Sequence, residues 1–154
     1  MRAIELMSRN PATCNPDTDL ERAARMMETH DCGCLPVVDN GSGRLVGVIT
    51  DRDIALRGVG HGKLPQSHVA DVMSAEVSCC HPVDDIETVQ RIMTERQVRR
   101  VPVVDDDGIC VGMIAQADLA LHNLPDHDVA KTVERISEPS PSGRREMAGG
   151  IQPG

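Results

Sequence analysis

The stretch that decides the fold occurs twice in the chain. Residues 35–53 read LPVVDNGSGRLVGVITDRD, and residues 101–118 read VPVVDDDGICVGMIAQAD. In each copy a β-rich run is followed by a turn that contains glycine and then by a second β-rich run, a pattern typical of a β-hairpin. The copies differ in length by one residue inside the turn, where a hairpin absorbs such a change. The chain is therefore predicted to contain two copies of one structural unit.

The repeat extends well beyond the hairpins. A shift of 66 residues places residues 7–39 on residues 73–105, and a shift of 65 places residues 43–56 on residues 108–121. About 60 residues per copy cannot cover both faces of a three-stranded sheet, so the two copies should pack on each other. We therefore expect a cleft between two units related by a pseudo-two-fold axis.

Each unit is expected to follow the order strand, helix, strand, strand, helix. Apolar residues recur at helical spacing over residues 20–27, and Thr18 with Glu21 three residues later marks the start of that helix. Asp84 with Glu87 marks the same start in the second unit. The remaining predicted elements are the strands 35–38, 45–50, 101–104 and 109–114, the short extended pieces 12–14 and 77–79, and the helices 51–57 and 116–123. The predicted fold class is α/β, of the α+β kind, with two tandem β-α-β-β-α repeats.

Composition divides the chain further. Gly58, Gly60, Gly62 and Pro65 indicate a linker between the repeats, and the residues after position 137 are rich in Pro, Gly and Ser. The predicted organisation is a first repeat 1–58, a linker 59–68, a second repeat 69–124, a C-terminal helix 125–137 and a disordered tail 138–154.

Charge and composition exclude several classes of partner. The chain of 154 residues has 16 basic and 24 acidic side chains and no Phe, Tyr or Trp. An acidic chain without aromatic rings lacks both the positive charge and the stacking platforms that nucleic acids require. No apolar run is long enough to span a bilayer, and no signal peptide is recognisable at the start. We expect a cytoplasmic protein that binds neither nucleic acid nor membrane.

The duplicated motif resembles a known family. The run 35–39 followed by 47–53, and again 101–105 followed by 112–118, is similar to the CBS domain, named after cystathionine β-synthase. Together the copies resemble a stand-alone CBS pair, or Bateman module, over roughly residues 4–123. The resemblance implies that an adenosine-containing ligand such as AMP, ADP, ATP or S-adenosylmethionine binds in the cleft, that the protein is a homodimer, and that it has a regulatory, non-enzymatic role. No required cofactor is implied, and no catalytic motif occurs.

The resemblance places a carboxylate of each repeat at the ribose of a ligand. Asp53 and Asp118 occupy this position, and a carboxylate can accept two hydrogen bonds from a cis-diol. Thr50 adds a hydroxyl at a helix start, where free N–H groups favour phosphate. Ala115 replaces the family's Thr or Ser in the second copy, so the Asp53 site is expected to be the better one. Helix capping is the alternative role of Asp53.

Each site is also expected to borrow residues from the other copy. Carried over from the family, Ala70, Val98 and Arg99 would face the site formed by Thr50 and Asp53. These three residues lie in the first part of the second repeat and just before its hairpin.

Basic residues before the hairpin suggest a phosphate contact. Arg99 and Arg100 match the family's phosphate-contacting position for the second site, and alternation along a strand suggests that one of them enters the cleft. The alternative is that both are solvated charges at a strand edge. The first copy has Gly33 and Cys34 at this position, which leaves Arg52 as its phosphate partner.

Three neighbouring side chains raise the alternative of a metal site. His30, Cys32 and Cys34 could bind zinc, but they lack the spacing of recognised zinc modules, and buried cysteine acting as a small apolar residue is the favoured interpretation. The alternative function is a metal- or thiol-dependent stress-response protein with vestigial nucleotide sites. A third possibility is a purely structural dimerisation module.

Overall fold

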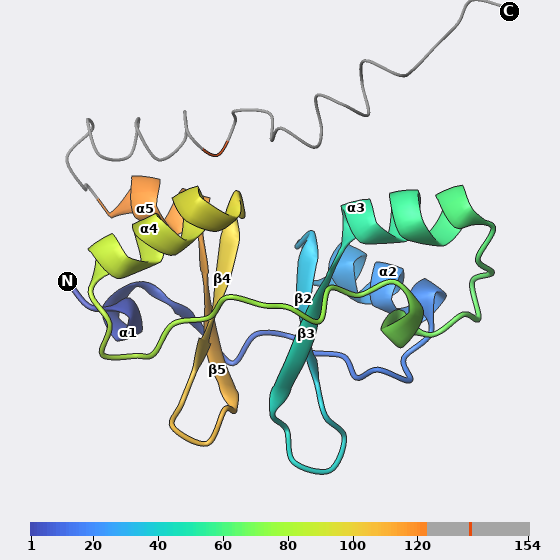
Figure 1. The fold of residues 1–154 in the computed structure, drawn as a ribbon, viewed down its shortest axis with the longest axis horizontal. Helices are drawn as coiled ribbons and strands as arrows, with labels where there is room; N and C mark the ends of the chain where they lie inside the picture. Colours follow the sequence, from blue (N-terminus) through green and yellow to red (C-terminus); the bar gives the residue numbers. More distant parts are fainter. Residues whose placement is uncertain (123–135, 137–154) are drawn as a thin grey trace, which may run out of the picture.

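The structure, a computed structural model, describes residues 1–122 and Ile136. Two β-hairpins stand side by side with helices at their outer sides (Figure 1). The first hairpin pairs β2 (Cys34–Val38) with β3 (Leu45–Thr50), and the second pairs β4 (Arg100–Val104) with β5 (Cys110–Ala115), both antiparallel. The same irregularity in register follows Val37 in one hairpin and Val103 in the other. The predicted α+β fold with two equivalent repeats is confirmed.

The helices flank the hairpins in equivalent positions. α2 (Leu20–Thr29) and α4 (Ile86–Arg96) precede the hairpins, while α3 (Asp51–Asp53), which continues as the π-helix η1 (Ile54–Gly58), and α5 (Gln116–Leu121) follow them. The further short elements are α1 (Ala3–Leu6), β1 (Ser8–Arg9), and the 3₁₀ turns η2 (Val59–His61) and η3 (Val69–Asp71). Among the residues that the structure describes, no helix is long and apolar enough to cross a membrane.

Two helix starts were predicted one residue too early. Asp19, not Thr18, caps α2, because the Asp19 side chain accepts a hydrogen bond of 2.6 Å from the backbone N–H of Arg22. Similarly, α4 begins after Asp85 and not after Asp84. Each pair consists of two adjacent residues that are both suited to capping, so composition alone could not choose between them.

The predicted extended pieces 12–14 and 77–79 do not form strands. In their place single parallel bridges connect Cys14 to Val37 and Cys80 to Val103, on the edges of β2 and β4 that do not pair within the hairpins. The predicted helix 125–137, apart from Ile136, and the predicted tail 138–154 lie outside the described residues.

The two units exchange their first segments. α1 and β1 pack on the second unit, where Ser8 pairs with Met113 of β5, and Figure 1 shows α1 beside the second hairpin. In return, η3 packs into the core of the first unit, and Ser74 pairs with Val48 of β3. Ser74 is the repeat equivalent of Ser8, and Val48 that of Met113, so the exchange is symmetric. The predicted division of the chain at residues 59–68 stays a prediction, because a segment from each side of it packs in the unit formed by the other side.

Each unit has its own apolar core, and the hairpin turns connect the units at one end. The core of the first unit includes Leu35 and Ile49, and that of the second includes Val101 and Ile114, all completely buried. At the turns, the backbone N–H of Leu45 donates to the carbonyl of Gly108 at 2.9 Å. Because the turns are in contact, the open ends of the hairpins, away from the turns, remain available for a cleft.

Candidate functional site

A cleft of about 1080 Å³ lies between the two units at the open ends of their hairpins. Its walls come from β2, β3 and α3 of the first unit, from the connecting segment 74–78, and from the end of α4 and the start of β4 in the second unit. Ile136, which is 8% exposed, also lines it. The cleft thus draws on both repeats, as a shared ligand site requires.

The cleft collects most of the candidate ligand-binding residues. Those that line it are Thr50, Arg52, Asp53, Val98, Arg99 and Arg100. Ala70 does not line it, because it lies in η3, where its N–H donates to the carbonyl of Pro16 at 3.0 Å. Asp118 does not line it either, since it lies at the start of α5 on the other side of the pseudo-two-fold axis. The described structure therefore presents one site well and leaves the Asp118 position outside it.

Asp53 is held by a reciprocal helix cap and by an arginine. Its carboxylate accepts a hydrogen bond from the N–H of Thr50, and its own N–H donates to the Thr50 hydroxyl, both at 3.0 Å. The other carboxylate oxygen accepts from Arg57 at 2.9 Å, and the same guanidinium nitrogen donates to the hydroxyl of Ser74 at 3.0 Å. Asp53 therefore does cap the helix. Each carboxylate oxygen still has a lone pair for a further donor.

Asp118 has fewer partners than Asp53. Its carboxylate accepts from the N–H of Ala115 at 2.7 Å, but the methyl group of Ala115 cannot accept the reciprocal bond that Thr50 accepts in the first unit. This geometry agrees with the expectation that the substitution removes a polar group from the second site.

A left-handed residue directs the basic segment into the cleft. Gln97, with φ of 54°, ends α4 and reverses the chain, and the N–H of Val98 then donates to the carbonyl of Met93 at 3.1 Å. Arg99 and Arg100 follow this turn, and together with Arg96, the last residue of α4, they line the cleft. The expectation that only one of Arg99 and Arg100 reaches it was wrong, because Arg99 precedes the first residue of β4 and the alternation rule applies inside strands.

Arg96 is a cleft residue that sequence reasoning missed. The signal was present, since Arg96, Arg99 and Arg100 are three arginines within five positions. An arginine at the end of a predicted helix carries no local sign that it faces a cleft, because this depends on how the helix packs beside the other unit.

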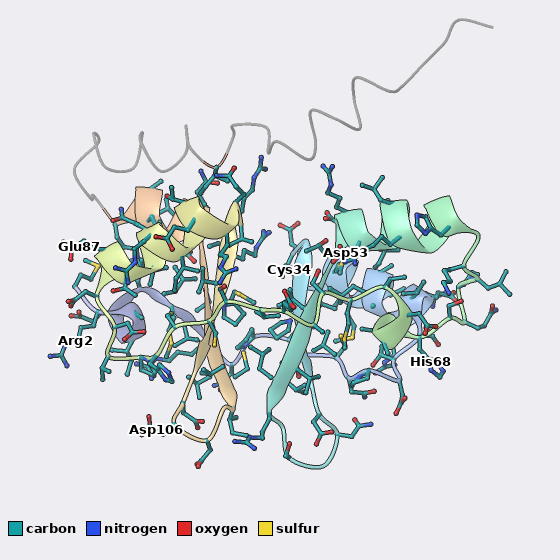
Figure 2. The ribbon with its side chains drawn as sticks, in the orientation of Figure 1. Arg2, Cys34, Asp53, His68, Glu87 and Asp106 are labelled. Carbon is teal, nitrogen blue, oxygen red and sulfur yellow. The ribbon has the colours of Figure 1, made fainter. Side chains whose placement is uncertain are left out.

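The thiol of Cys34 lies on the cleft wall beside charged groups. Burial is the main cause that raises the pKa of Cys34 to about 12, and the neighbouring Arg100 guanidinium opposes this increase. Cys32, Asp53 and Asp51 raise it further, and Figure 2 shows Cys34 next to Asp53 at the open end of the first hairpin. A thiol with this pKa stays protonated at neutral pH and is a poor nucleophile and metal ligand.

The candidate zinc ligands do not gather into a site. His30 lines a separate groove along α2, whereas Cys34 lines the cleft. Within residues 1–122 and Ile136 no group of three or more His, Cys, Asp or Glu side chains is placed to hold a metal ion. The described residues therefore do not fit a zinc site at this position.

Fold and cleft together define a tandem-repeat α+β module with a cavity between its two units. The model of the CBS domain family matches residues 3–59 and 69–123, and the chain belongs to this family. It is 35% identical over 133 residues to the CBS domain-containing protein YhcV of Bacillus subtilis, covering 86% of this chain and 93% of the relative. It is 34% identical over 140 residues to Hypoxic response protein 1 of Mycobacterium tuberculosis, covering 89% and 94%.

Solved structures agree with this assignment. Hypoxic Response Protein I, crystallised with two coordinated zinc ions, superposes with a TM-score of 0.73 and 31% identity over 81% of this chain and all of that chain. The CBS domain pair of protein MJ0100, in complex with 5′-methylthioadenosine and S-adenosyl-L-methionine, superposes with a TM-score of 0.72 and 27% identity over 79% and 94%. The chain is thus a CBS domain pair.

Proposed function

We propose that this protein is a regulatory module that binds an adenosine-containing ligand, namely AMP, ADP, ATP or S-adenosylmethionine, in the cleft between its two CBS repeats. The observation that carries the proposal is the position of the Asp53 carboxylate on the cleft wall, 16% exposed and fixed in place by Thr50 and Arg57. A fixed carboxylate can accept hydrogen bonds from a ribose diol without losing conformational entropy of its own. The adenosine ligands of the MJ0100 pair support the choice of ligand class.

The adenine ring would bind among aliphatic side chains. The apolar lining of the cleft comes from Val48, Val77, Val98 and Ile136, and it lies beside the polar groups of the cleft. This composition suits a flat heterocycle in a chain that has no aromatic residue for stacking.

Binding, and not bond formation, is the proposed activity. A ligand in the cleft would contact Asp53 of one unit and Arg100 of the other, and so connect the two repeats. It transmits a signal if it binds one arrangement of the repeats, or of a homodimer, more tightly than another. In this proposal the protein works in the cytoplasm on an effector protein, with no nucleic acid or membrane as partner.

A thermal-shift screen tests the proposal. AMP, ADP, ATP and S-adenosylmethionine are added to the protein, and unfolding is followed with a dye or by calorimetry, because the chain has no Trp or Tyr. At a hundredfold excess over the dissociation constant a ligand should stabilise the fold by about 2.7 kcal/mol. Asp53→Ala should remove most of this stabilisation, and the matched variant Asp118→Ala should retain it. The absence of a shift with all four compounds would reject the proposal.

A second candidate function is a metal- or thiol-dependent stress-response protein. The zinc-containing structure of a relative that is 31% identical favours it. The test is the zinc content of protein purified without chelator, together with a titration of reactive thiols in the native state. We expect no stoichiometric zinc and slow thiol reaction, and one bound zinc per chain that His30→Ala or Cys32→Ala removes would establish the alternative.

A further inference from the structure

We propose that the cleft selects an adenine nucleotide with two or three phosphates over AMP and over S-adenosylmethionine. This inference rests on the proposed function and names the charge class of its ligand. The observation behind it is a convergence of cationic side chains on one cavity. The arginines that line the cleft are Arg52, Arg96, Arg99 and Arg100.

These arginines come from both units and face a common space. Arg52 lies in the first turn of α3 on one wall, while Arg96 ends α4 and Arg100 begins β4 on the other wall. Arg100 and Cys34 line the same cleft, and the Arg100 guanidinium is close enough to this residue of the first unit to oppose the rise in its pKa. Positive charge thus surrounds the cavity on two sides.

The four guanidinium groups have no anionic partner within the described part of the chain. The ion pairs found there are Arg25 with Glu21 on α2 and Arg57 with Asp53. Arg57 therefore balances the Asp53 carboxylate, and Asp51 and Glu76 are the remaining acidic side chains on the cleft. Four unpaired cations face two unpaired carboxylates, in a chain whose overall charge is −8. This local reversal of sign favours an anion.

The chemistry of the groups indicates which anion. A guanidinium group is planar and donates paired hydrogen bonds to phosphate oxygens, and these charge-assisted bonds are stronger than neutral ones. Arginines spread along a cleft can contact successive phosphates of ADP or ATP, whereas AMP offers one phosphate. S-adenosylmethionine has no phosphate, and its sulfonium and ammonium groups outweigh its single carboxylate, so the same arginines disfavour it.

Calorimetric titration with a matched ligand series tests this inference. The series is adenosine, AMP, ADP, ATP, S-adenosylmethionine and inorganic tripolyphosphate, each measured at low and at physiological salt. Affinity should increase about fivefold to tenfold with each added phosphate, because each forms charge-assisted hydrogen bonds. The advantage of ATP over AMP should shrink as salt rises, because screening weakens exposed charge pairs.

Single variants assign the effect to the cleft. Arg96→Gln and Arg100→Gln should each weaken ATP binding about tenfold and leave adenosine binding within about twofold, since adenosine has no phosphate. Arg22→Gln, on the outer face of α2 and outside the cleft, is the matched control and should leave both affinities unchanged. Circular dichroism confirms that each variant is folded.

The outcomes separate this inference from the proposed function. Equal affinity for AMP and ATP, or S-adenosylmethionine binding as tightly as ATP, would overturn the inference while the adenosine-binding function stands. Binding of tripolyphosphate without binding of any adenosine compound would preserve the anion cleft and overturn the adenosine function. If no compound binds, both are overturned.

Discussion

The two units share their interiors and differ at the rim of the cleft. Ile49 and Ile114 occupy equivalent positions and are both completely buried. At the rim, Thr50 in the first unit corresponds to Ala115 in the second, so the first carboxylate has a reciprocal cap that the second lacks. The two cores are therefore alike, while the positions that face the cavity differ.

The differences at the rim are complementary. Gly33 and Cys34 stand where the second unit has Arg99 and Arg100. The first unit therefore contributes Asp53 and a single arginine, Arg52, to the cavity, while most of its positive charge comes from the second unit. The cavity is thus asymmetric although the two units share one fold.

Core truncation should have the largest effect, and the same effect in both units. Ile49→Ala and Ile114→Ala each leave a cavity in a fully buried position and should cost about 2–5 kcal/mol of unfolding free energy. Because the first segments are exchanged, each variant should shift one common unfolding transition in urea, followed by circular dichroism. Two separate transitions would show that the units unfold independently.

Alkaline pH should destabilise the fold through buried thiols, more through the first unit than through the second. Burial raises the pKa of Cys14 to about 11 and those of Cys34 and Cys80 to about 12. A folded-state pKa above the unfolded value of 9.0 gives stability that is complete below pH 9 and lost as pH rises from 9 toward 12. Each thiol contributes at most about 1.4 kcal/mol per pH unit, so the loss should grow steadily between pH 9 and pH 11.

Stability measured by urea denaturation between pH 8 and pH 11 checks the thiol effect. The chain has no Tyr, so thiols dominate titration in the first part of this range. Replacing Cys14 and Cys34 by Ala should flatten the pH dependence more than replacing Cys80, whose unit has Arg100 where the other has Cys34. Burial also raises the pKa values of Cys79 and Cys110, so a smaller pH dependence should remain without the three thiols. An undiminished pH dependence would contradict the assignment.

An added methyl group on the hairpin, where each exchanged segment packs, should have a different cost in the two units. A Cβ at Gly47 would lie 2.7 Å from the backbone carbonyl oxygen of Ser74, whereas at the equivalent Gly112 it would meet the Met7 side chain. We expect Gly47→Ala to cost about 1–3 kcal/mol, because backbone must move, and Gly112→Ala to cost less, because a thioether can change rotamer. Equal costs in urea denaturation would show that the two exchanged contacts are alike.

The smallest difference concerns the side chains four residues after Asp53 and four residues after Asp118. Arg57 pairs with Asp53 and Ser74 but is half-exposed, so Arg57→Ala should cost about 0.5–1 kcal/mol. His122 holds the equivalent position, and His122→Ala should change stability by less than about 0.5 kcal/mol, as is usual for surface sites. High salt should reduce the Arg57 effect, and a cost that is unchanged in salt would contradict an ionic origin.

Local patterns made much of this fold predictable. The hairpins are confirmed to within one residue at each strand end, because alternation, turn glycines and the repeat all act over a few neighbouring residues. Errors arose where two adjacent residues were equally suited to cap a helix, as at Thr18 and Asp19. They also arose where a single bridge formed in place of a predicted strand, as at Cys14. Arg96 was missed because its place on the cleft depends on how the end of α4 packs beside the first unit.

By itself the sequence determined that the chain contains two equivalent α+β units, and it predicted Thr50, Asp53 and the arginines before the second hairpin as ligand-binding residues. Only the tertiary structure decided that the first segments are exchanged, that Arg57 holds Asp53, and that Arg96 joins the cleft while Ala70 and Asp118 stay outside it. The reason is physical. Periodicity and motifs report interactions between residues close in the chain, whereas a shared cavity depends on which distant surfaces pack together.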